Sequence, residues 1–462
     1  MIETELIGVL GLVGLFTLLL VGVPVGLSMV CIGIVGNYAL SYAVPYLRFE
    51  PYLMQFKTLL WNVVASYELS VIPLFILMGF LASHANLSRD LFQGINAIVG
   101  RFKGGVAMAA IGACAGFGAV CGSSLATSST MGRVALPELR RLNYSPGLAT
   151  GALAAGGTLG ILIPPSVALV IYAIIVEASI IEMFQAAILP GILAIVGFIV
   201  VIIIIVRIDP HAAPKPNPMI GAERRRAIFR LIPVLLIFGA IILGLGMGIF
   251  TPTPAAGVGV FAIFSYGLLL RFWGEGLTLS GIKRSLLDTA ITSGMIYFIL
   301  FGAEIIKSFF TRAGLPAALA NWSASSGMDP WLTLILMLIL LILLGCFIES
   351  LSMILVVVPF FWPALVVLNG GDYVAATDAA FGMDSEQLKI WFGILALVVV
   401  ELGLITPPVG LNVFIISSLS QDVQMKTVFR GVMPFFSAEV IRIALIIAFP
   451  TITLFLPNFL SG

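Results

Sequence analysis

The chain has 462 residues, of which 60% are hydrophobic and only 10% are charged. Its mean hydropathy of +1.15 leaves too little polar surface to cover a water-soluble protein of this length. The formal net charge is +1, and the sequence contains neither a basic domain for nucleic acid nor the phosphate-binding glycine loop of an ATP-driven pump. The composition therefore indicates an integral membrane protein with no nucleic-acid partner and no ATPase of its own.

Apolar stretches of membrane-spanning length recur along the chain. In the hydrocarbon core of a bilayer every backbone group needs a partner within the protein, so these stretches must be helices and the fold class is all-α. The first spans in chain order are expected at residues 6–22, 25–44 and 59–83.

The next apolar stretch, at about 106–139, predicts a re-entrant hairpin rather than a single span. It is preceded by Arg101 and Lys103 and followed by Arg140 and Arg141. Short loops rich in Lys and Arg remain in the cytoplasm, so both ends of the stretch lie on the cytoplasmic side. A segment that enters and leaves on one face must turn back inside the membrane, and the polar sequence GSSLATSS marks the expected tip.

A broken helix follows this hairpin, at about 148–176. The Pro-Pro pair in its sequence LGILIPPSVALV removes two N–H donors and interrupts the helix. A span at 185–206 completes the first half. A cytoplasmic linker at 207–230 comes next, and it contains the densest basic cluster of the chain, formed by Arg207, Lys215, Arg224, Arg225, Arg226 and Arg230.

The second half repeats this order in the opposite orientation. Its first spans are expected at residues 231–250, 255–270 and 286–306. A second hairpin is expected at about 331–368, interrupted at ESLS, and a second broken helix at about 390–419 carries the sequence LGLITPPVGLNV. Because Lys426 and Arg430 follow on the cytoplasmic side, the second hairpin must open from the outside.

The two halves, 1–206 and 231–462, are therefore predicted to be inverted copies, each with five transmembrane helices and one hairpin. The interval between hairpin tip and Pro-Pro pair is 41 residues in the first half and 58 in the second, and a polar insertion before residue 390 accounts for the difference. Inverted repeats with broken helices are the architecture of secondary transporters, which bind substrate and coupling ion near the bilayer midplane.

The paired breaks predict a site for a hard cation and for a small anion. Carbonyl groups of unwound backbone suit Na⁺, and the N-termini of half-helices suit an anionic group. Oxygen donors are plentiful around the breaks, which favours Na⁺ or H⁺ over a transition metal. The candidate Na⁺ ligands are Gly122, Ser123, Ser124, Gly157, Thr158, Ser350, Ser352, Thr406, Pro407 and Gly410. The candidate substrate contacts are Ser123, Ser124, Thr127, Pro164, Pro165, Glu349, Ser350 and Asn412.

Acidic residues inside apolar membrane segments are energetically costly, so each one indicates a functional or structural role. Glu349 lies in the second hairpin with no Lys or Arg close in sequence, which makes it the strongest candidate for a functional carboxylate. Glu401 ends the apolar run GILALVVVELG and is expected on a helix-packing face. Glu439 and Arg442, three residues apart, are expected to form a pair within one helix.

Six stretches of the chain match one known family in order and over nearly its whole length. They are IPLFILMGFL, FGAVCGSSLATSSTMGRVALPEL, GTLGILIPPSVALVIYA with LPGIL after it, GIFTPTPAAGVGVFAIF, GCFIESLSMILVVVP and LGLITPPVGLNVF. On these stretches the chain resembles the large membrane subunit of tripartite ATP-independent periplasmic (TRAP) transporters. It departs from the family at TPTPA, where Thr-Pro-Thr-Glu-Ala is frequent, and at Glu349, where Asp is frequent.

The resemblance implies a function, a location and partners. It implies Na⁺-coupled import of an organic acid across the bacterial inner membrane by a multi-pass protein. The acid would be delivered by a periplasmic substrate-binding protein, and a separate small four-helix membrane subunit would bind this chain. The resemblance also implies an elevator mechanism, in which the two hairpins and the two broken helices move as one transport body against a scaffold.

Other functions remain open on the sequence alone. A stand-alone Na⁺/dicarboxylate or citrate carrier would share the paired hairpins and is the closest alternative. An ion channel would need a continuous pore lined by several subunits, which an inverted repeat does not provide. An enzyme is not indicated, because the sequence has no His-Glu-x-x-His motif and its two histidines, His84 and His211, lie far apart.

Overall fold

The computed structural model describes residues 2–44, 47–214, 219–272, 276–325 and 327–461. Among these residues, seven helices are long and apolar enough to cross a membrane, and two bent helix pairs raise that number to nine. The predicted all-α membrane class is therefore confirmed.

The first predicted span that differs in the structure is 59–83. The N-terminal helices are α1 (Ile2–Leu20), α2 (Val25–Ala43), α3 (Phe49–Val64), the short 3₁₀ helix η1 (Glu68–Ser70) and α4 (Val71–His84). The predicted single span is two helices, because α3 and the η1–α4 segment meet at 54°. The Ser66 hydroxyl accepts from the Leu69 amide at 3.4 Å and the Ser70 hydroxyl donates to the Tyr67 carbonyl at 2.5 Å. Such local bonds compete with the helical hydrogen bonds and favour a break.

Helix α5 (Leu87–Val99) was not expected, and it packs on helix α12 (Gly221–Gly246). Because α12 begins inside the predicted linker 207–230, Arg224, Arg225, Arg226 and Arg230 belong to a helix rather than to a loop, while Lys215 lies outside the described residues. Arg224 Nε donates to the Ala97 carbonyl at 3.2 Å, and Arg230 Nη1 lies 3.6 Å from Asp90 Oδ1. The basic residues therefore attach α12 to α5.

In the first half, the residues of the predicted hairpin form two helices, and the helix that contains the first Pro-Pro pair is bent. Helices α6 (Gly105–Cys121) and α7 (Ser124–Arg141) pack on each other. They are followed by α8 (Pro146–Gly157), α9 (Leu159–Leu162), α10 (Val167–Val176) and α11 (Ile180–Ile208). The α8–α9 segment and α10 meet at 45° around the cis Pro164–Pro165 bond.

The second half follows the same order. Helices α13 (Pro252–Arg271), α14 (Leu279–Arg312) and α15 (Leu315–Ser325) precede the hairpin of α16 (Pro330–Gly345) and α17 (Ser350–Asn369). Helices α18 (Ser385–Gly403) and α19 (Leu411–Leu419) form the second broken helix around the cis Pro407–Pro408 bond. The described chain ends with α20 (Met425–Ala448) and α21 (Thr451–Ser461).

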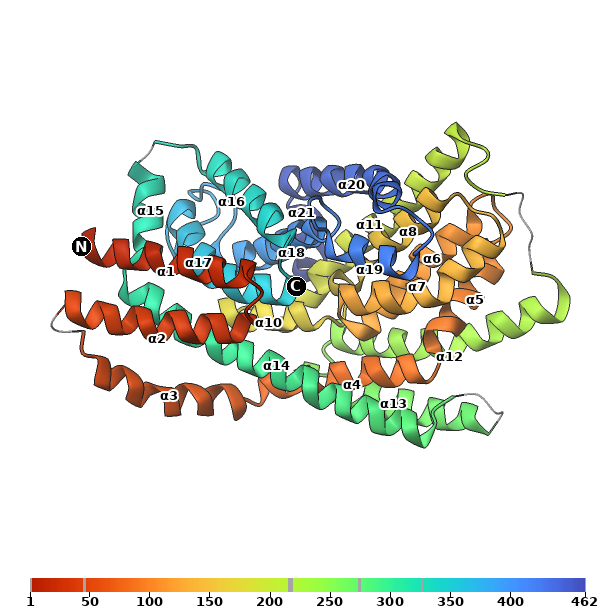
Figure 1. Ribbon diagram of the computed structural model, residues 1–462, viewed down its shortest axis with the longest axis horizontal. Coiled ribbons are helices and arrows are strands. Elements are labelled where there is room, and N and C mark those ends of the chain that lie inside the picture. The colour runs from red at the N-terminus through yellow and green to blue at the C-terminus, as the bar shows by residue number, and fades with distance from the viewer. Residues whose placement is uncertain (1, 45–46, 215–218, 273–275, 326, 462) are drawn as a thin grey trace.

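The hairpins and broken helices of both halves meet in the middle of the molecule. Helix α7 packs on α8 and α19, and α10 packs on α17 and α18. The 34-residue helix α14 runs obliquely across the lower half of the view in Figure 1 and contacts α2, α3, α4 and α17. Long peripheral helices therefore surround a centre that both halves build, while the inverted orientation of the halves stays a prediction.

Candidate functional site

The two hairpin tips present the first predicted site residues. At the first tip, Gly122 has a left-handed φ of 60° and caps the end of α6, and the Ser123 hydroxyl caps the start of α7 by accepting from the Ala126 amide at 3.4 Å. At the second tip, Glu349 is the N-cap residue of α17, but its side chain makes no capping hydrogen bond. The Glu349 carboxylate is therefore available to a ligand.

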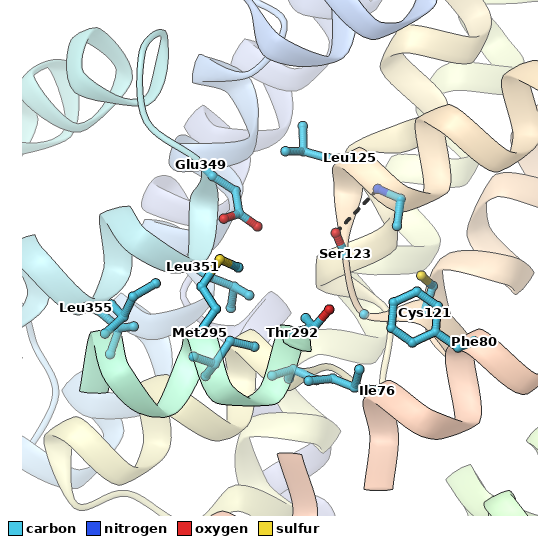
Figure 2. A pocket seen from close by; sticks show the side chains of 15 residues that line it. Ile76, Phe80, Cys121, Ser123, Leu125, Thr292, Met295, Glu349, Leu351 and Leu355 are labelled. Atoms are coloured by element: carbon cyan, nitrogen blue, oxygen red, sulfur yellow. Dashed lines mark hydrogen bonds between the residues drawn. The ribbon is translucent and has the colours of Figure 1, made fainter. Parts of the chain in front are cut away.

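A pocket of about 320 Å³ separates the two tips. Figure 2 shows Ser123 and Glu349 on opposite sides of this pocket, with Thr292 of α14 beneath them and Phe80 of α4 at one end. Among the described residues that line the pocket, Glu349 is the only carboxylate or basic side chain. Mostly apolar walls with a few convergent polar groups are typical of a small-molecule site.

A second cluster lies behind the first tip, where α7, α8 and α19 pack together. The side-chain oxygens of Thr127 and Ser128 and both amide atoms of Asn412 are buried without a hydrogen-bond partner. A Cβ atom at Gly157 would lie 1.8 Å from Ser128 Oγ and 3.2 Å from Asn412 Nδ2, so these two side chains meet at the glycine. Buried polar groups normally pair with a protein group, a water or a ligand, and such a concentration of them is typical of a binding position.

The same cluster extends to Gly160 of α9. A Cβ atom there would lie 2.6 Å from Thr127 Oγ1 and 3.1 Å from the carbonyl oxygen of Ser123. The peptide of Ser123 thus borders the cluster, while the Ser123 side chain lines the pocket. Hydroxyl, amide and carbonyl oxygens are the donors that a hard cation such as Na⁺ takes.

Two predicted cation ligands use their hydroxyl protons within their own helices. Thr158 Oγ1 donates to the Ala155 carbonyl and Thr406 Oγ1 donates to the Leu402 carbonyl, each at 2.6 Å. Such i−3 or i−4 bonds are frequent for Thr in helices. Each oxygen still has lone pairs for a cation.

The remaining candidates of the second half lie around its break. The Pro407 carbonyl accepts from the Cys346 thiol at 3.4 Å, which connects the break to the second hairpin. Gly410 starts α19 with a left-handed φ of 58°, a conformation that favours glycine. Ser352 is buried in the first turn of α17.

Pro164 and Pro165 shape the first break and do not line the pocket. The break ends at Ser166, whose hydroxyl donates to the Ile161 carbonyl and accepts from the Leu169 amide at 3.5 Å. These bonds start α10 at Val167, which is the part of the first broken helix that reaches the pocket.

Ser124 and Ser350 contact a carboxyl group instead of facing an open site. Ser124 Oγ donates to Glu401 Oε2 at 2.5 Å, and Ser350 Oγ donates to Glu401 Oε1 at 2.6 Å. Glu401 is only 1% exposed. Glu401 thus lies on a buried helix face, as expected, and its carboxyl group also binds the first residues of α7 and α17, which the sequence did not predict.

A sequence signal for Glu401 existed. Glu401 precedes Pro407 by six residues, and Thr158 precedes Pro164 by six. The two polar residues therefore hold matching positions before the two breaks. No comparable signal pointed to Thr292, because α14 carries no motif.

The pair of Glu439 and Arg442 is confirmed. The two side chains of α20 form a buried ion pair, and Arg442 Nη1 also donates to the Pro190 carbonyl of α11 at 3.3 Å. This pair connects α20 to α11 behind α18 and takes no part in the pocket.

The chain is similar to known transport proteins over nearly its whole length. A family model described as "Tripartite ATP-independent periplasmic transporter, DctM component" matches residues 12–452. The C4-dicarboxylate TRAP transporter large permease protein of Pseudomonas aeruginosa is 32% identical, over 92% of this chain and 94% of the relative. The sialic acid TRAP transporter large permease protein of Vibrio cholerae is 29% identical, over 97% of this chain and 98% of the relative.

One solved structure is similar in fold. The YdaH transporter of Alcanivorax borkumensis aligns with a TM-score of 0.57 and 14% identity, over 86% of this chain and 88% of that one. At this identity the likeness concerns the arrangement of helices.

Proposed function

Because this chain belongs to the DctM component family of tripartite ATP-independent periplasmic transporters, we propose that it imports an organic acid, delivered by a periplasmic substrate-binding protein, at the expense of a Na⁺ gradient. Members of the family are permease subunits rather than enzymes. The chain is accordingly a multi-pass transport subunit of the bacterial inner membrane.

The proposed substrate is a carboxylate. The relatives from Pseudomonas and Vibrio are named for C4-dicarboxylates and for sialic acid, and both kinds of molecule carry a carboxylate. The pocket suits a small acid in volume, and the starts of α7 and α10 border it at Ser123 and Val167. Helix N-termini carry partial positive charge, so they favour an anionic group there.

One observation carries the proposed coupling to Na⁺. The Ser123 side chain lines the pocket, and its carbonyl oxygen borders the cluster of Thr127, Ser128 and Asn412. A cation bound in the cluster would fix the position of Ser123 and hence one wall of the substrate pocket. Substrate and cation would then each strengthen the binding of the other, since coupling between two sites is reciprocal.

The position of the pocket favours an elevator. On one side of the pocket lie α4 and α14, which pack on each other. Helix α4 also packs on α13, and α14 also packs on α2. On the other side lie the hairpin tips with α10. When one of two such groups of helices slides past its neighbour, a pocket between them is exposed first to one face of the membrane and then to the opposite face. We propose that the hairpins and broken helices are the moving group.

The proposed partners are the two other components of a tripartite system. They are a small four-helix membrane subunit and the periplasmic binding protein. The direct test reconstitutes this chain with both partners in proteoliposomes and measures uptake of labelled malate and of labelled sialic acid.

Uptake is expected with an inward Na⁺ gradient and with the binding protein present. Equal uptake with choline in place of Na⁺, driven by a pH gradient, would contradict Na⁺ coupling. Equal uptake without the binding protein would instead favour the stand-alone carrier.

A further inference from the structure

Glu401 is bound by both hairpins at once. Its two carboxyl oxygens accept from Ser124 of the first hairpin and Ser350 of the second, at 2.5 and 2.6 Å, and the residue is 1% exposed. Its own helix, α18, belongs to the second broken helix. Three segments that are far apart in sequence therefore meet at one carboxyl group.

The two serines hold equivalent places in the two halves. Ser124 is the first residue of α7 and Ser350 is the first residue of α17, so each begins the second helix of its hairpin. The carboxyl group has no such counterpart, because Thr158 occupies the matching position before the first break and donates to its own helix. The Glu401 contact thus departs from the repeat and is a particular feature of this site.

The residues bound to Glu401 are the chain neighbours of the pocket walls. Ser123 precedes Ser124 and Glu349 precedes Ser350, and Figure 2 shows Ser123 and Glu349 on opposite sides of the pocket. Because adjacent residues share a stiff peptide unit, the position of each serine determines the position of the pocket wall beside it.

The contact is strong for a pair of side-chain hydrogen bonds. Both oxygen–oxygen distances, 2.5 and 2.6 Å, lie at the short end of the range for O–H···O hydrogen bonds, and each serine is the first residue of its helix. A hydroxyl deprived of this acceptor would be a buried polar group in need of a new partner.

From this arrangement we infer that Glu401 is a positioning residue, which holds the two hairpin tips at a fixed separation and thereby sets the width of the substrate pocket. Glu401 is not among the residues that line the pocket, so it acts through the serines that it binds. The inference rests on the proposed function only for the identity of the pocket as the substrate site.

The test compares substitutions that keep or remove the two contacts. Glu401→Gln keeps both, because the amide oxygen accepts from one serine and the amide NH₂ donates to the other hydroxyl. Glu401→Ala removes both. Ser124→Ala combined with Ser350→Ala also removes both and leaves the carboxyl group in place, which covers the case in which Glu401→Ala fails to fold.

The first readout is the separation of the tips, measured by electron paramagnetic resonance between spin labels. The labels are attached at Leu125→Cys and Phe347→Cys in a chain whose native cysteines have been replaced. The distance distribution should be unchanged in Glu401→Gln and broadened in Glu401→Ala and in the double serine variant. This measurement needs neither Na⁺ nor substrate, so it is independent of the proposed transport activity.

The second readout is uptake against substrate concentration. We expect KM to rise roughly tenfold or more in Glu401→Ala and in the double serine variant, and to stay within about threefold in Glu401→Gln. A narrow, unchanged distance distribution in both disrupted variants would overturn the inference. Equal loss in the Gln and Ala variants would also overturn it, because the charge rather than the contacts would then matter.

Discussion

Replacing Ser128 by alanine removes one hydroxyl from the cluster behind the first hairpin tip, and its expected effect depends on the cation. Ser128 Oγ is buried without a hydrogen-bond partner. A buried hydroxyl in that state costs about 1 to 3 kcal/mol of stability. In the absence of Na⁺, Ser128→Ala should therefore leave the stability unchanged or raise it, since alanine is also the better helix former.

With Na⁺ bound, the same substitution should be harmful. If Ser128 Oγ is a ligand, its loss removes an interaction of about 1 to 3 kcal/mol, which lowers the apparent Na⁺ affinity roughly 5- to 160-fold. Maximal uptake should be largely recoverable at high Na⁺ concentration, because the other oxygens of Thr127 and Asn412 remain.

The assay is thermal unfolding of the purified protein in detergent, titrated with NaCl against a choline chloride baseline. A bound cation stabilises the protein in proportion to the logarithm of its concentration over Kd, so the Na⁺ titration reports affinity directly. Ser418→Ala is the matched control, because Ser418 is an exposed serine of α19 whose hydroxyl donates to the Ile415 carbonyl at 2.7 Å.

The control should leave the Na⁺ titration unchanged. A lower melting temperature of Ser128→Ala in choline, together with an unshifted Na⁺ titration, would refute the reasoning. The hydroxyl would then be a packing element of α7 rather than a ligand.

Two further predictions concern the fold and its orientation. A Cβ atom at Gly118 would lie 2.3 Å from the Gly160 Cα atom, so Gly118→Ala should destabilise the protein by about 1 to 3 kcal/mol in thermal unfolding. Gly239→Ala, where a Cβ meets no atom within 4 Å, is its control, and equal melting temperatures would contradict the close approach of α6 and α9. The predicted inverted topology requires that Arg141→Cys is labelled by a membrane-impermeant maleimide only from the cytoplasm and Asp378→Cys only from outside. Both positions are exposed, and labelling of both from one face would disprove the inverted repeat.

Hairpins and breaks were predictable because their signals are local. Two Pro-Pro pairs interrupt two apolar segments, and a loop with Arg140 and Arg141 after a long apolar stretch requires the chain to turn back. The prediction of a single span at 59–83 was wrong, because the apolar composition continues through a bend at which the hydroxyls of Ser66 and Ser70 bind the backbone.

The site was predictable only in part, because the type of a residue does not reveal which side chain will be its hydrogen-bond partner. Ser124, Ser128 and Ser350 are alike in sequence as serines near hairpin tips. In the structure Ser128 has no hydrogen-bond partner, while Ser124 and Ser350 bind Glu401.

The sequence by itself determined the membrane class, the two breaks at the Pro-Pro pairs and the residue types around them, but neither helix α5 nor the bend between α3 and α4. These features depend on hydrophobicity, backbone hydrogen bonding and proline geometry, which act within one segment. Only the tertiary structure decided that Glu349 lines a pocket while Glu401 holds the hairpin tips, and that Asn412 meets Ser128 at Gly157. Those roles depend on which surfaces face one another when helices from both halves pack, and such contacts join residues hundreds of positions apart.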